Sequence, residues 1–117
     1  WVVLDEAVLR RVVGGRDVMY EQVSRLCKMA EKPHVTLQVL PFAKGAHAAI
    51  DGGFQILEFP EPDDLDVVHV ESSAGNIYLE KRHEIRRYSM MFDRLRADAL
   101  SLDESAAFLA AVRDAYA

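Results

Sequence analysis

The chain has 117 residues, the length of one ordinary domain; half of them are hydrophobic and 28% are charged. Its formal net charge of −5 argues against DNA binding by the chain as a whole, because contact with phosphates depends on lysine and arginine. The single cysteine excludes a disulfide framework and a thiolate metal site. No apolar run approaches the roughly 20 residues that cross a bilayer. We therefore expect a cytoplasmic domain with a hydrophobic core and no membrane contact.

The first segment is predicted to contain a strand and a short helix. Trp1 to Leu4 is bulky and β-branched, which favours a strand. Asp5 is a suitable N-cap for a helix that ends before Gly14 and Gly15. Because the chain opens inside a predicted strand, we expect its natural N-terminus to lie upstream.

Residues 16–31 are predicted to form the first full helix, which Pro33 ends. Their apolar side chains recur at helical spacing and form one stripe. The stripe consists of Met19, Val23, Leu26, Cys27 and Ala30. Cys27 lies within it, so we interpret this thiol as a small buried hydrophobe. Residues 34–40 then alternate as a strand, which Pro41 terminates.

Three further strands are predicted at 54–59, 66–71 and 77–80. The first is mostly apolar on both faces, so we expect it to lie centrally in a sheet. The acidic turn 60–64 and the turn 72–76 are short. Short connections favour antiparallel neighbours, because parallel strands need a longer crossover.

The C-terminal third is predicted to form two helices. Residues 81–99 carry a narrow apolar seam, and residues 102–116 follow a capping box made by Ser101 and Glu104. The seam consists of Ile85, Tyr88, Phe92, Leu95 and Ala99. The whole pattern predicts an α+β fold: an antiparallel or mixed sheet of about four to five strands, helices packed mainly on one face, and a C-terminal helical hairpin. We expect one regulatory or interaction domain over residues 1–117.

Candidate metal-binding and catalytic groups are scattered along the chain. The four histidines have no close ligand spacing. A cluster of His47, His69 and Glu71 would form only if two strands brought the loop at 41–53 close. No nucleophile motif of the G-x-S-x-G type is present. We therefore expect no catalytic residue, no metal and no cofactor.

A small hydrolase is the alternative from another class of protein. Glu58, Glu71 and Glu80 lie on successive predicted strands and could line one face of the sheet. A deep pocket that holds two of these carboxylates, or one of them with His69, would favour this alternative.

On helix 81–99, basic and acidic side chains are interleaved, which is typical of a solvated face.

The connection at 41–53 is long for a loop between two strands and combines an aromatic side chain, glycines and a titratable ring. This composition suits a lid or a contact loop, and a structured loop that caps the core is the alternative. The ligand- or partner-binding residues that we predict are Phe42, His47, Glu71 and Tyr78. Phe42 and Tyr78 offer apolar area. His47 offers a pH-sensitive donor or acceptor, and Glu71 offers a charge at a strand end.

An ordered series of short blocks runs along essentially the whole chain. The blocks lie at residues 3–11, 13–15, 33–42, 45–48, 54, 57–60, 70–71, 77–80 and 92–97 (VLDEAVLRR, VGG, PHVTLQVLPF, GAHA, F, LEFP, VE, IYLE and FDRLRA). In this order they resemble the uncharacterised C-terminal domain of actinobacterial helix-turn-helix regulators of the Xre family.

The resemblance implies a DNA-binding helix-turn-helix domain N-terminal to this chain, with a further helical segment between the two. It also implies a small protein partner encoded nearby and no established enzymatic activity. We therefore expect a non-catalytic effector- or partner-binding domain of a DNA-binding transcription regulator, with DNA contacted only through the missing N-terminal domain. A second copy of the chain is a further expected partner, and a domain that serves only for dimerisation is an alternative.

Overall fold

The computed structural model describes residues 1–63 and 65–117, and it has an α+β fold. The chain divides into two compact units, each with its own small sheet. Unit 1 comprises Trp1–Gly45 and Arg96–Ala117, and unit 2 comprises Ala46–Leu95.

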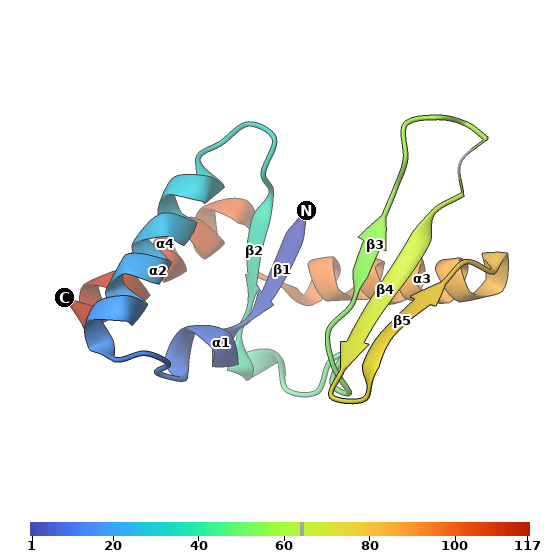
Figure 1. Cartoon of the computed structure of the whole chain (residues 1–117). Helices are drawn as coiled ribbons and strands as arrows, with labels where there is room; N and C mark the ends of the chain where they lie inside the picture. The colour runs from blue at the N-terminus through green and yellow to red at the C-terminus, as the bar shows by residue number, and fades with distance from the viewer. Residues whose placement is uncertain (64) are drawn as a thin grey trace. The chain divides into compact units, whose positions relative to one another are not determined.

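The sheet of unit 1 consists of two parallel strands, β1 (Val2–Asp5) and β2 (Leu37–Leu40). The chain passes between them through two helices, α1 (Glu6–Arg10) and α2 (Arg16–Ala30) (Figure 1). Parallel strands need such a crossover, because a tight turn can join only antiparallel neighbours. The predicted elements of this segment are therefore confirmed, and their pairing is parallel.

The core of unit 1 lies among β2, α2 and the C-terminal helix α4 (Leu102–Tyr116). Its buried members are Leu9, Val23, Leu37, Val39, Leu109 and Val112. Leu26, Cys27 and Ala30 pack against this cluster, so the apolar stripe of α2 is confirmed as a core-facing surface. All four residues of β2 are buried.

Local signals place the helix ends of unit 1 as the sequence predicts. The Asp5 carboxylate accepts a hydrogen bond from the Ala7 amide at 2.8 Å and caps α1. Gly14 and Gly15 take φ values of +80° and +94°, a region that residues with a Cβ rarely adopt. The predicted capping box at the start of α4 is also present, with both reciprocal hydrogen bonds.

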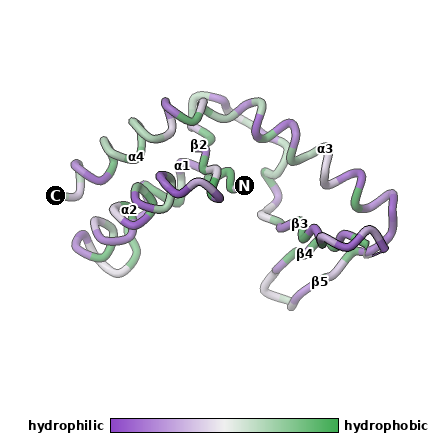
Figure 2. Tube along the Cα trace, turned by 90° about the horizontal axis from the view of Figure 1, so that it is seen from above, coloured by the Kyte–Doolittle hydropathy of each residue, from purple (hydrophilic) through white to green (hydrophobic). Residues whose placement is uncertain are grey.

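The sheet of unit 2 is an antiparallel meander in the order β3 (Gln55–Leu57), β4 (Val67–Ser72) and β5 (Gly75–Leu79) (Figure 1). Helix α3 (Arg82–Asp98) follows it. Figure 2 shows hydrophobic and hydrophilic residues alternating along α3, as its predicted seam requires. Within the unit, the rings of Phe54 and Tyr88 meet edge to face, with centroids 5.0 Å apart.

Three details of the predicted architecture are wrong. The strands form two small sheets and not one sheet of four to five strands, and the strand predicted at 54–59 is a short edge strand rather than a central one. The C-terminal hairpin is also corrected, because α4 packs on α2, whereas most of α3 belongs to the other unit. The prediction of one regulatory domain over 1–117 stays a prediction.

Over residues 1–63 and 65–117, the structure contains no helix that combines the length and the hydropathy required to span a bilayer.

Candidate functional site

The meander of unit 2 has two chemically different faces, because successive side chains of a strand point to opposite sides. On β4, Val68 is fully buried and Val70 is half-buried on one face. His69 and Glu71 alternate with these valines and therefore lie on the other face. The register places Gln55 and Tyr78 opposite His69, and Asn76 opposite Glu71. This second face, termed here the polar face, gathers hydrogen-bonding groups from all three strands. It is defined by Gln55, His69, Glu71, Asn76 and Tyr78.

His69 lies at the centre of the polar face. Its Nδ1 is 3.2 Å from Gln55 Oε1 on β3, and its Nε2 is 2.9 Å from Asn76 Oδ1 on β5. The ring stacks on Tyr78, with centroids 5.0 Å apart and an angle of 22° between the planes. An amide side chain carries both a donor and an acceptor, so the two amides can match either neutral tautomer of the imidazole.

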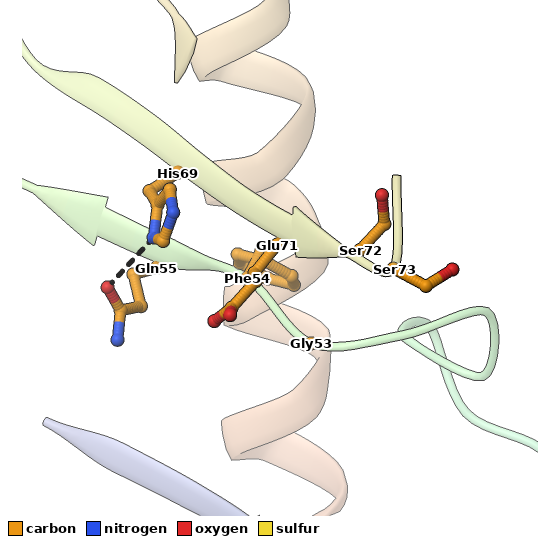
Figure 3. Close-up of a pocket in the computed structure, with 7 residues that line it drawn as sticks. All are labelled: Gly53, Phe54, Gln55, His69, Glu71, Ser72 and Ser73. Carbon is orange, nitrogen blue, oxygen red and sulfur yellow. Dashed lines mark hydrogen bonds between the residues drawn. The ribbon is translucent and has the colours of Figure 1, made fainter. Parts of the chain in front are cut away.

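An open hollow of about 640 Å³ borders this arrangement (Figure 3). Its lining comes from the start of β3, from β4 and from the turn after β4. The lining residues are Gly53, Phe54, Gln55, His69, Glu71, Ser72 and Ser73. The volume is in the range of small-molecule sites, which is on the order of 300–1,000 Å³. The hollow therefore offers a carboxylate, an amide, an imidazole, hydroxyl groups and one aromatic ring to a ligand.

The groups around the hollow are arranged for hydrogen bonding. The ring nitrogens of His69 face amide oxygens rather than a serine hydroxyl. The hydroxyl of Ser72 donates to the Gly75 carbonyl at 3.3 Å and accepts from the Ala74 amide at 3.2 Å, so it belongs to the β4–β5 turn. These contacts support recognition of polar groups, and they do not assemble a nucleophile with its base.

The structure brings together two of the four predicted contact residues. Glu71 lines the hollow, and Tyr78 supports His69 from the neighbouring strand. Phe42 lies instead in a short 3₁₀ segment of unit 1 (Phe42–Lys44), where it is 56% exposed and its backbone amide donates to Glu6. His47 is half-buried in unit 2, and its Nδ1 accepts a hydrogen bond from the Ala49 amide.

The carboxylates considered for a hydrolase are not gathered. Glu58 and Glu80 are exposed and do not line the hollow, where Glu71 lies with His69. In the part of the chain that the structure describes, no group of three or more His, Cys, Asp or Glu residues is placed to hold a metal ion.

The sequence does not indicate Gln55 or Asn76 as site residues, and it suggests His69 only as a metal ligand or a catalytic group. Alternation along residues 66–71 does indicate that His69 and Glu71 lie on the same face of the strand. The partners of His69 depend on the register between strands, which the turn at Ser72–Gly75 sets and which single-strand alternation does not reveal.

Fold and hollow together define a small α+β protein with an open hollow beside the polar face of one sheet. Residues 1–111 match a family described as a domain of unknown function (DUF5753), and the chain therefore belongs to that family. Comparisons with curated proteins and with solved structures gave no match.

Proposed function

We propose that this chain is a non-catalytic effector-binding domain of a DNA-binding transcription regulator, and that the hollow beside His69 receives a small polar effector. One observation supports the ligand site above all. His69 is tied to both neighbouring strands by Gln55 and Asn76, and the same face carries the exposed carboxylate of Glu71 beside open space. Such convergent polar groups on a fixed sheet are typical of sites that orient a ligand.

The regulatory part of the proposal has separate support. The ordered blocks along the chain resemble the C-terminal domain of actinobacterial Xre-family regulators, and membership of a family without known activity is compatible with that origin. A net charge of −5 suits a domain that leaves DNA contact to another part of the polypeptide. Sequencing the gene upstream of the codon for Trp1 tests this part, and a reading frame without a helix-turn-helix segment would contradict it.

The hollow offers a simple way to convert binding into a structural change. A ligand that hydrogen bonds to Gln55 or His69 competes with the bond that joins β3 to β4 on this face. It would therefore favour one arrangement of the meander over another, and it shifts the equilibrium only by its difference in affinity for the two. The missing DNA-binding domain would sense that difference.

A thermal-shift screen tests the ligand site. Free amino acids, nucleosides and monosaccharides are added singly to the chain, and a ligand of the folded state raises the melting temperature through mass action. We expect at least one compound to raise it. The rise should be lost in Glu71→Ala, and it should be retained in Glu58→Ala, which removes an exposed carboxylate that does not line the hollow. An equal rise in both variants would place the ligand elsewhere.

A further inference from the structure

Helix α3 carries an exposed face whose side chains recur at i, i+4, i+7 and i+11. A shallow groove of about 350 Å³ follows this face, termed here the basic face. It is defined by His83, Arg86, Arg87, Met90, Met91 and Arg94. Met90 is 56% exposed and lies between Arg87 and Arg94 along the helix.

The charged side chains that line the groove are basic, and no acidic residue lines it. Over the described parts of the chain, no carboxylate lies within ion-pair distance of Arg86, Arg87 or Arg94. The sequence predicts a solvated face with interleaved charges from Glu84, Asp93 and Asp98. Asp93 and Asp98 are exposed and Glu84 is half-buried, but none of the three lines the groove. The result is a local concentration of positive charge on an acidic protein, with an apolar methionine at its centre.

The complementary surface lies on the same chain, in the connection between β3 and β4. Glu58, Glu61 and Asp63 are exposed there, and no ion pair joins them to any described residue. Between and beside them, Phe59 is 46% exposed and Leu65 is 59% exposed. These described residues, Glu58, Phe59, Glu61, Asp63 and Leu65, are termed here the acidic segment. They combine carboxylates with apolar side chains, which is the composition that the basic face would accept.

We propose that the basic face of α3 binds the acidic segment of a second copy of this chain. Guanidinium groups pair with carboxylates in bidentate geometry, and a flexible methionine adapts to an apolar side chain such as Phe59 or Leu65. Among the described residues, no ion pair joins the two surfaces within one chain. A two-fold arrangement would form the contact twice, because each copy contributes one surface of each kind. Nucleic acid fits less well, since the centre of the face is apolar and the chain is acidic overall.

Sedimentation velocity over a range of protein concentrations tests this pairing. We expect a monomer–dimer equilibrium at low salt that shifts toward monomer at about 0.5 M NaCl, where exposed charges are screened within a few ångströms. Arg87→Glu with Arg94→Glu should weaken the dimer about tenfold or more, and so should Glu61→Lys with Asp63→Lys. Arg25→Glu with Lys28→Glu, on the exposed side of α2, is the matched control and should leave the equilibrium unchanged.

The decisive experiment mixes the two charge-reversed variants, one changed on the basic face and the other changed in the acidic segment. Each should be largely monomeric alone, and together they should form a heterodimer, because each contact again joins opposite charges. Circular dichroism of each variant verifies that it is folded. A chain that stays monomeric at low salt, or a mixture that does not associate, would overturn the proposal. If a monomer instead bound an acidic peptide or duplex DNA through Arg87 and Arg94, the face would belong to that partner.

Discussion

The backbone amide of Val39 donates a hydrogen bond to the hydroxyl of Ser105 at 2.9 Å, and both residues are completely buried. The Val39 carbonyl accepts from the Leu100 amide at 2.9 Å. These two contacts satisfy both backbone groups of Val39, which lies in β2 beside β1. A helix N-terminus therefore takes the place of a third strand in unit 1, which explains how a two-stranded sheet can be stable there.

Removal of the Ser105 hydroxyl should destabilise the folded chain, because it takes away one buried hydrogen-bond acceptor. Ser105→Ala leaves the buried Val39 amide without an acceptor, while the Leu100 carbonyl keeps its bond from Gln38 at 2.9 Å. We expect a loss of about 1–3 kcal/mol in the free energy of unfolding, measured by urea denaturation. Ala106→Ser, at an exposed position of the same helix, is the control and should change stability little. A Ser105→Ala variant as stable as the parent chain would remove the structural role of this bond.

Gln38 makes a second buried polar link in unit 1. Its Oε1 accepts from Trp1 Nε1 at 2.8 Å, and the Arg96 guanidinium lies 4.7 Å from the centroid of the Trp1 ring. Trp1 is the one tryptophan of the sequence, so tryptophan fluorescence reports the surroundings of this side chain. Gln38→Leu should shift the native emission and cost about 1–3 kcal/mol. Gln22→Leu, on the exposed side of α2, should do neither. An unchanged spectrum in Gln38→Leu would show that the indole does not depend on this partner.

The capping box predicts a pH dependence of stability. The backbone amide of Ser101 donates to the Glu104 carboxylate and holds the pKa of that group below its ordinary value of 4.5. Protons therefore bind more weakly in the folded state. The stabilisation is complete above pH 4.5 and is lost as the pH falls through the lowered pKa. Denaturant midpoints between neutral and strongly acidic pH should show a smaller acid loss in Glu104→Gln than in the parent chain. Equal acid losses would contradict this assignment.

The core of unit 1 gives a matched pair of substitutions on one helix. Leu109 is fully buried among α2, β2 and α4, whereas Leu102 on the same helix is 54% exposed. Leu109→Ala should destabilise unit 1 by about 2–5 kcal/mol, because it removes buried methyl groups and leaves a cavity. Leu102→Ala should cost much less. Hydrogen exchange of amides in α2 and β2 measures the effect, and similar exchange rates in the two variants would contradict the assigned core.

The sequence predicts local features of this chain well. The stripe of α2, the cap at Asp5 and the capping box at Ser101 depend on residues close together in the chain, and the structure confirms each. Helix capping and helical periodicity depend only on residues close in sequence, so they can be predicted without knowledge of the fold. The turns at 60–64 and 72–76 likewise indicate antiparallel neighbours, and the meander confirms that pairing.

Features that depend on distant residues are not visible in the sequence. The sequence pattern indicates that Gln38 is a polar residue of an alternating strand. In the structure it is buried, because Trp1 and Leu100, which are distant in sequence, supply its hydrogen-bond partners. The strand at 54–59 reads as central because its apolar residues fit either place in a sheet. The sequence predicts Glu71 and Tyr78 as contact residues, whereas the position of Asn76 beside them follows only from the register of β4 with β5.

Backbone amide NMR spectra of the labelled chain test the ligand site beside His69 most directly. The compound that raises the melting temperature most is titrated into the chain, and each perturbed amide is assigned. We expect saturable shifts confined to unit 2 and centred on Gln55, His69 and Glu71, which line the hollow. His69→Ala should abolish them, and His34→Ala, an exposed residue of unit 1, should not. Saturable shifts centred on unit 1, or shifts that persist in His69→Ala, would contradict the assignment of the hollow as an effector site.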